Sequence, residues 1–157
     1  MDYRVFIGLG SNQGDKIAQC EAAIKQILGI PDTTLLDRSA WYVTEPWGKE
    51  DQEWFVNGVI RIKTSLDPHE LFGTLKEIER RLGRKGSVQW GPRPIDLDIL
   101  FYDQLVLASP GLEIPHPHLH LRNFVLVPLA EIAPEFLHPL RQQTIRALVA
   151  QSPDPKV

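Results

Sequence analysis

The sequence predicts an α+β fold, a two-layer sandwich in which two helices lie on one antiparallel sheet. Segments with strand-like alternation and segments with helical spacing follow one another in the order β-α-β-β-α-β. Two amphipathic helices over a single sheet in this order are typical of a ferredoxin-like sandwich. The proline-rich remainder of the chain is predicted to form a C-terminal extension of this βαββαβ core.

The first part of the chain is predicted to form a β-α-β unit. Residues 5–9 are an apolar run that ends at Gly10, which predicts a strand followed by a turn. Apolar residues then recur with helical spacing over residues 17–28, and Asp15 can cap this helix. A second strand is predicted over residues 35–44.

The middle of the chain carries the strongest local signals. Residues 54–63 alternate as a strand does, and the alternation places Trp54 on the apolar face, where we expect it in the core. The next helix, residues 68–82, is preceded by Asp67 as its cap. Glu70 stands three residues later, so the pair predicts a capping box.

The C-terminal part is predicted to hold one more core strand, residues 95–102, before the extension begins. Prolines are frequent in the extension and exclude long regular elements. We expect a short strand, a short helix, a final helix and a frayed tail, over residues 106–108, 124–132, 144–151 and 152–157 respectively.

The composition excludes several classes of protein. The 157 residues fit one globular domain, residues 1–157. Cys20 is the only cysteine, so the chain can form no internal disulfide, and no apolar stretch is long enough to span a bilayer. The net charge of −3 disfavours a general nucleic-acid binder. We therefore expect a cytoplasmic monomer whose partners are small molecules, with no nucleic acid and no membrane.

Asp96 and Asp98 stand two residues apart inside an otherwise apolar strand. Side chains at this spacing share one face of a strand, roughly 6.6 Å apart. Two neighbouring carboxylates repel each other unless a positive group lies between them, and Mg²⁺ prefers oxygen ligands. A bare Asp-x-Asp is more often a pair of exposed acids, but Asp is depleted in strands. We therefore predict that this pair holds two magnesium ions, as in phosphoryl-transfer sites.

Basic residues precede the acid pair. Arg84 and Lys85 follow a glycine in a predicted loop, and Arg93 lies between two prolines immediately before the strand. Arginine binds phosphate oxygens through paired hydrogen bonds and stays charged. Arginines opposite two magnesium-binding acids predict a polyphosphate site, although a solubilising role is the better interpretation of Lys85.

Phe55 and Asn57 share the strand face opposite Trp54. A flat ring can stack on Phe55 while the amide of Asn57 donates and accepts hydrogen bonds, which suits a planar heterocycle. Packing of Phe55 beneath a loop is an equally good interpretation of the pattern.

His116, His118 and His120 alternate along the chain, as the ligands of a strand-borne metal site do. Zinc is the less favoured interpretation, because a fourth ligand at the usual spacing is missing. We expect His116 to contact phosphate and the other two to lie at the surface.

Residues 90–100, WGPRPIDLDIL, closely resemble the signature of the 6-hydroxymethyl-7,8-dihydropterin pyrophosphokinase family. Several separated segments resemble other motifs of this family in the same order, which is far more specific than one motif alone. These segments are residues 7–12, 44–48, 55–57, 114–117, 122–126 and 128–134.

The resemblance implies a magnesium-dependent transferase of tetrahydrofolate biosynthesis. Such an enzyme transfers pyrophosphate from ATP to the hydroxymethyl group of the pterin, giving the pterin diphosphate and AMP. The resemblance implies that Asp96 and Asp98 bind both magnesium ions and that the pterin lies between two phenylalanine rings. By residue, it implies a catalytic set of Arg84, Arg93, Asp96 and Asp98, an ATP set of Glu79, Arg84, Arg93, Ile99, His116 and Arg122, and a pterin set of Thr44, Glu45, Trp47, Phe55, Asn57, Trp90 and Phe124.

Two other functions use parts of the same pattern. A magnesium-dependent nucleotide hydrolase needs the acids and the arginines but no pterin pocket. An RNA-recognition domain on a ferredoxin-like sheet would use the aromatic residues for base stacking. The sequence pI of about 5.9 and the acid pair on a strand disfavour RNA binding.

Overall fold

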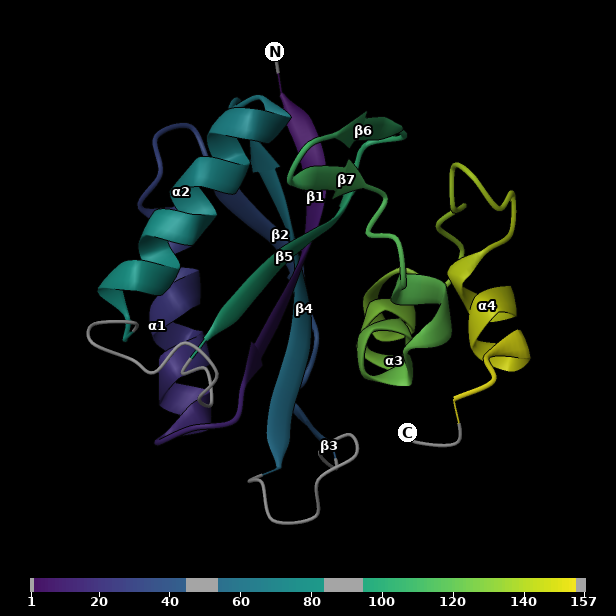
Figure 1. Cartoon of the computed structure of the whole chain (residues 1–157), viewed down its shortest axis with the longest axis horizontal. Coiled ribbons are helices and arrows are strands. Elements are labelled where there is room, and N and C mark those ends of the chain that lie inside the picture. The colour runs from purple at the N-terminus through teal and green to yellow at the C-terminus, as the bar shows by residue number, and fades with distance from the viewer. Residues whose placement is uncertain (1, 45–53, 84–94, 155–157) are drawn as a thin grey trace.

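The computed structural model describes residues 2–44, 54–83 and 95–154, and these form an α+β fold around one antiparallel sheet. The strands of this sheet lie in the order β2-β4-β1-β5, and β3 pairs with β4 beside this path. Figure 1 shows α1 and α2 on one side of the sheet and α3 and α4 on the other. The elements of the sheet and of the first helical layer are β1 (Tyr3–Ser11), α1 (Lys16–Leu28), β2 (Thr34–Arg38), β3 (Tyr42–Thr44), β4 (Phe55–Thr64), α2 (Pro68–Arg81) and β5 (Asp96–Tyr102).

The predicted helix starts are confirmed by their caps. The side chain of Asp15 accepts a hydrogen bond from the backbone amide of Ala18, at the start of α1. At the start of α2, the Asp67 side chain accepts from the amide of Glu70, and the Glu70 side chain accepts from the amide of Asp67. This reciprocal pair is the capping box that the sequence predicts.

The single predicted strand over residues 35–44 is wrong, because it divides into β2 and β3. At the break, the Ser39 side chain accepts a hydrogen bond from the amide of Val59, 2.9 Å away, and the Ser39 amide donates to the Val59 carbonyl. The ring of Trp41 then packs directly over Gly58 of β4. The Ser39 hydroxyl oxygen thus accepts from a β4 amide in place of a backbone carbonyl. The strand is interrupted at this point, while β2 and β3 both still pair with β4.

The C-terminal extension adds a partial third layer. It contains a two-stranded hairpin, whose second strand the sequence analysis missed, and it packs α3 and α4 against the sheet. Pro128 lies inside α3, where the helix continues past it. The elements of the extension are β6 (Leu107–Ser109), β7 (Leu112–Ile114), the 3-10 turn η1 (Leu119–Leu121), α3 (Asn123–Ile132) and α4 (Ile145–Gln151).

Each face of the sheet therefore has its own apolar core. The larger core lies between the sheet and the first two helices, and includes Ile7 of β1 and Leu75 of α2. The second core lies under the extension and includes Phe6 of β1, Leu100 of β5 and Leu126 of α3. The continuous apolar run of β1 follows from this arrangement, since a strand covered on both faces does not alternate.

Two further predictions fail, one about Trp54 and one about the C-terminal tail. Trp54 is 50% exposed and precedes β4, so it is not in the core. The predicted frayed tail is wrong for residues 152–154, because Asp154 is only 9% exposed and hydrogen-bonds to Asn123. Across the described ranges, no helix is long and apolar enough to cross a membrane.

The contact between Trp41 and Gly58 predicts a steric effect on stability. A Cβ atom added at Gly58 would lie 2.6 Å from two carbons of the Trp41 ring, so Gly58→Ala should lower the free energy of unfolding by about 1–3 kcal/mol. Urea denaturation measures the change. Gly73→Ala in α2 is the matched control, because its Cβ would meet nothing within 4 Å and should raise the same free energy by roughly 0.5–1 kcal/mol. Equal stability of Gly58→Ala and the wild type would contradict this packing.

Candidate active site

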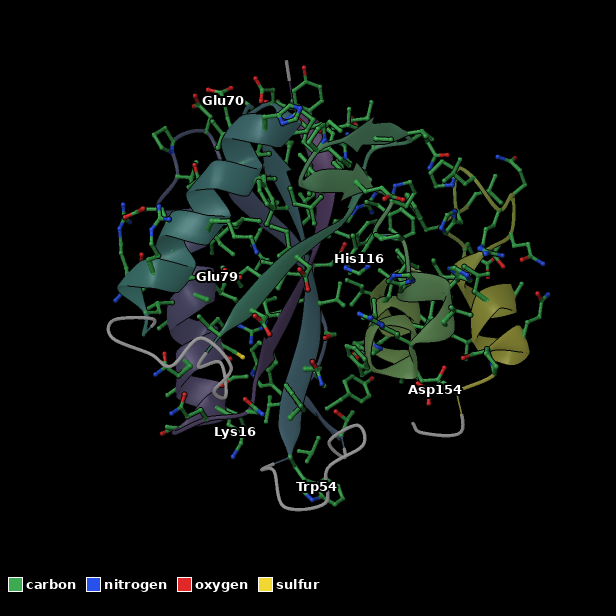
Figure 2. All side chains as sticks on the ribbon, viewed as in Figure 1. Lys16, Trp54, Glu70, Glu79, His116 and Asp154 are labelled. Carbon is green, nitrogen blue, oxygen red and sulfur yellow. The ribbon has the colours of Figure 1, made fainter. Side chains whose placement is uncertain are left out.

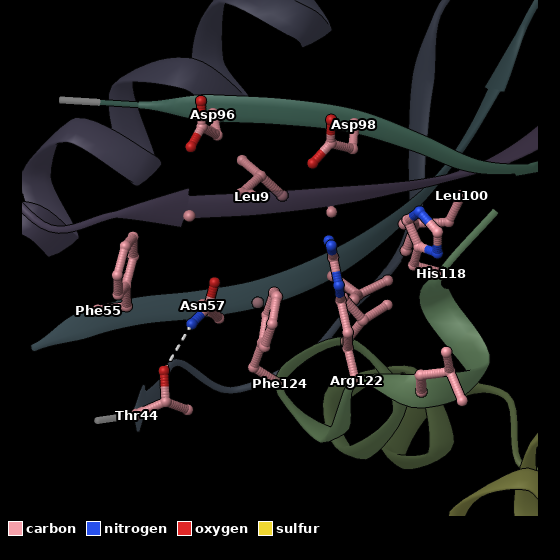
Figure 3. A pocket seen from close by; sticks show the side chains of 16 residues that line it. Leu9, Thr44, Phe55, Asn57, Asp96, Asp98, Leu100, His118, Arg122 and Phe124 are labelled. Atoms are coloured by element: carbon pink, nitrogen blue, oxygen red, sulfur yellow. Dashed lines mark hydrogen bonds between the residues drawn. The ribbon is translucent and has the colours of Figure 1, made fainter. Parts of the chain in front are cut away.

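A cavity of about 710 Å³ lies between the sheet and the start of α3. It lies on the same sheet face as the second apolar core and borders that core at Val59 and Leu100 (Figure 3). Backbone and side chains of β1, β3, β4, β5 and α3 contribute to its walls. The lining residues that the sequence analysis selected are Thr44, Phe55, Asn57, Asp96, Asp98, Arg122 and Phe124.

Asp96 and Asp98 both line the cavity, from one face of β5. Leu97 between them is buried in the larger core on the opposite face, as strand alternation requires. Figure 3 shows both carboxylates directed into the cavity. Two acidic groups therefore point into one space, where they can act together on a ligand.

Glycines of β1 form the floor between the acids and β4. Gly8 is in register with Asp98, and Gly10 is in register with both Asp96 and Asn57. A Cβ atom at Gly10 would lie 2.7 Å from the side-chain oxygen of Asn57. In the sequence these glycines stand out only as part of a motif, and this role was not predicted. Their i, i+2 spacing on a strand, matching that of the acids, is the signal that could have found it.

The aromatic and amide groups meet at the other end of the cavity. Phe55 and Asn57 of β4 and Phe124 of α3 line it together, although Phe124 is far away in the sequence (Figure 3). The side-chain nitrogen of Asn57 donates a hydrogen bond to the Thr44 hydroxyl oxygen, 2.9 Å away, in a buried position. This bond fixes the orientation of the amide, so its oxygen remains directed toward Gly10 and the cavity floor.

Basic groups face Asp98 across the cavity. Arg122 lines the cavity at the start of α3, with its guanidinium carbon 5.8 Å from the centre of the Phe124 ring. Burial lowers the pKa of His116, while the charge of Asp98 opposes this shift and that of Arg122 adds to it. His116 is thus within electrostatic reach of both residues, although His118, not His116, is the histidine that lines the cavity.

Glu79 and Ile99 do not line the cavity. Ile99 belongs to the larger core. Glu79, on α2, is 1% exposed, and its carboxylate accepts a hydrogen bond from the Leu97 amide at 2.7 Å. Among the described strands β5 lies at the edge of the sheet, so its outer amides have no strand partner there, and Glu79 supplies an acceptor for one of them. Glu79, labelled on α2 in Figure 2, thus supports the strand that carries the acid pair. Its contact with ATP stays a prediction.

Several predicted site residues lie outside the described residues. These are Glu45, Trp47, Arg84, Trp90 and Arg93.

Zinc binding by the three histidines gains no support. Within residues 2–44, 54–83 and 95–154, no group of three or more potential ligands is arranged to hold a metal ion. The ring of His120 instead contacts the Arg141 guanidinium, with 2.6 Å between the two nitrogens.

Comparison with known proteins identifies the family. Residues 6–134 match the family described as 7,8-dihydro-6-hydroxymethylpterin-pyrophosphokinase (HPPK). The chain belongs to this family. A 2-amino-4-hydroxy-6-hydroxymethyldihydropteridine pyrophosphokinase of Methylorubrum extorquens is 43% identical over 148 residues, which cover 94% of this chain and 92% of that protein. The protein with the same name from Aquifex aeolicus is 40% identical over 142 residues, covering 90% and 88% of the two chains.

Similarity to solved structures supports the fold. The crystal structure of Plasmodium falciparum HPPK-DHPS S436F/A437G/A613S triple mutant with SDX-DHP superposes with a TM-score of 0.78 at 17% sequence identity. The superposition covers 96% of this chain and 44% of that longer chain. At this identity the likeness shows that this HPPK chain shares the fold.

The hydrogen bond from the Leu97 amide to Glu79 predicts that removing Glu79 destabilises the fold more than removing Glu77 of the same helix. Glu79→Ala leaves the buried Leu97 amide without its acceptor, so the free energy of unfolding should fall by about 1–3 kcal/mol. Amide hydrogen exchange at Leu97 should accelerate at the same time. The matched control is Glu77→Ala, which removes an exposed glutamate of the same helix and should change stability by less than about 0.5 kcal/mol. If both variants behave alike, the support of β5 by Glu79 is wrong.

Proposed function

We propose that the chain transfers pyrophosphate from ATP to the hydroxymethyl group of 6-hydroxymethyl-7,8-dihydropterin, a step of tetrahydrofolate biosynthesis. One observation carries the proposal: an acid pair suited to phosphate-bound cations and an aromatic and amide site suited to a heterocycle share one cavity. The family match over residues 6–134 supports the same reaction. A nucleotide hydrolase does not need the aromatic and amide site of this cavity, which Phe55, Asn57 and Phe124 form.

The acid pair fits magnesium by its chemistry. Both donors are carboxylate oxygens, which this hard cation prefers, and they lie side by side on one strand. We propose that Asp96 and Asp98 hold two ions with the triphosphate. Bound there, the ions would neutralise charge on the phosphate oxygens and help orient them for transfer.

The chain's own residues would mainly bind and orient the two substrates. The pterin would stack between Phe55 and Phe124, and Asn57 would hydrogen-bond its edge, oriented by Thr44. Arg122 lies beside Phe124 and close to the acids, where it can bind phosphate oxygens. Stacking and hydrogen bonding at one end, and charge at the other, would place the pterin hydroxymethyl group next to the triphosphate.

In the proposed reaction, the hydroxymethyl oxygen attacks the β-phosphorus of ATP. A bond forms between these two atoms, the bond from the β-phosphorus to the oxygen bridging to the α-phosphate breaks, and AMP leaves with that oxygen. Asp96 is our candidate to accept the hydroxyl proton. Positioning and charge neutralisation supply most of the acceleration in such transfers.

Further assignments rest on the resemblance. We propose that Arg84 and Arg93 stabilise charge on the transferred group, that Ile99, His116 and Glu79 contact ATP, and that Glu45, Trp47 and Trp90 complete the pterin site. The strand order β2-β4-β1-β5 supports the ferredoxin-like description of the core. A single domain over residues 1–157, a monomeric state, a cytoplasmic location and the lack of nucleic-acid or membrane partners stay predictions.

AMP formation from ATP, magnesium and the hydroxymethyl pterin tests this function. The wild-type chain should form AMP only when the pterin is present, and chelation of magnesium should stop the reaction. Asp98→Ala should lower turnover by roughly 100-fold or more, because the transition state loses charge stabilisation, while the fold persists because like-charge repulsion is relieved.

Asp37→Asn is the matched control, since it also removes an exposed strand aspartate but lies on β2, outside the cavity. It should keep wild-type turnover. AMP release at the same rate without the pterin would identify a hydrolase instead, and wild-type turnover in Asp98→Ala would contradict the role of the acid pair.

A further inference from the structure

The start of α3 carries two residues of the cavity but lacks a cap of its own. Arg122 precedes the first helical residue and Phe124 follows it, and both line the cavity. Arg122 occupies the cap position, yet its side chain makes no capping hydrogen bond. The first amides of a helix have no partner within the helix, so something else has to accept from them.

Pro128 weakens the same turn. A proline has no amide proton, so Pro128 cannot donate the usual helical hydrogen bond to the carbonyl of Phe124, four residues earlier. The backbone that carries Phe124 is therefore held by fewer helical bonds than a regular first turn. Its position depends more strongly on contacts from elsewhere in the chain.

The C-terminal tail supplies these contacts. The Asp154 carboxylate accepts a hydrogen bond from the Asn123 amide at 2.9 Å, and the Asp154 carbonyl accepts one from the Asn123 side chain at 3.0 Å. Both residues are buried. The negative charge lies at the helix N-terminus, where the helix dipole favours it. Figure 2 shows Asp154 just after α4.

The tail itself has a defined shape. Ser152 follows α4, and its side-chain oxygen accepts a hydrogen bond from the Asp154 amide at 3.2 Å. The end of α4 thus leads directly into the capping contact. Since α4 also packs against α3 through Leu148 and the second apolar core, Asp154 is brought to Asn123 by an element already fixed to the same helix.

We propose that Asp154 is a positioning residue of the active site, which caps α3 from 31 residues downstream and thereby fixes Phe124 and Arg122 on either side of Asn123. Asp154 touches neither substrate. It sets the distance across the cavity between Phe124 and Phe55, and it sets the direction of the Arg122 side chain. This inference rests on the proposed function for the identity of the two substrates.

The test compares Asp154→Ala with Thr144→Ala, which removes the cap of a different helix, α4. Asp154→Ala should raise the KM for the pterin at least fivefold and should accelerate hydrogen exchange of the Asn123 amide. Asp154→Asn, whose side-chain oxygen can still accept from that amide, should stay within about twofold of the wild-type KM. Thr144→Ala removes the cap of α4, where the Thr144 hydroxyl oxygen accepts from the Ala147 amide, and it should lower the melting temperature without raising the KM.

Three results would overturn the proposal: a wild-type KM in Asp154→Ala, an equal rise of the KM in Thr144→Ala, or no rescue by Asp154→Asn. If Asp154→Ala does not fold, Asn123→Ala replaces it, because it loses only the side-chain bond and should raise the KM two- to threefold. A wild-type KM in that variant would then count against the proposal. A wild-type chain that forms no AMP refutes the proposed function instead, and exchange of the Asn123 amide still tests the cap.

Discussion

Repulsion between two neighbouring carboxylates is the constraint on which the site depends. Asp96 and Asp98 share one face of β5, and their side chains enter a common cavity. Leu97 anchors the opposite face in the larger core, and Glu79 accepts from its amide, so the strand cannot easily turn the acids apart. The fold holds like charges together, which is stable when a cation binds between them.

The sheet face that carries the acids serves two purposes along its length. At one end, Phe6 and Phe101 belong to the second apolar core, to which α3 and α4 contribute. At the other end, Gly8 and Gly10 replace large side chains and leave the cavity open. Because α3 spans both regions, the helix that closes the core also delivers Phe124 to the cavity. One helix therefore contributes both to the second apolar core and to the cavity wall.

Local signals predicted the parts of the structure that depend on near neighbours. The structure confirms the capping box of Asp67 and Glu70, and it confirms that Asp96 and Asp98 share one face of a strand. Each of these features depends only on residues a few positions apart. Contacts between distant segments were not predictable. The break between β2 and β3 depends on Gly58 of another strand, and the burial of Asp154 depends on the start of α3. Neither contact leaves a periodic pattern in the sequence.

The central claim, that Asp96 and Asp98 hold two divalent cations with the nucleotide, is tested most directly by electron paramagnetic resonance of Mn²⁺. The titration uses the whole chain with an ATP analogue that cannot be cleaved between its α- and β-phosphates. The account predicts two Mn²⁺ ions per chain with the spin coupling expected for ions about 3.5–4 Å apart. A single uncoupled ion, or the same coupled pair in a chain with both aspartates changed to asparagine, would contradict it.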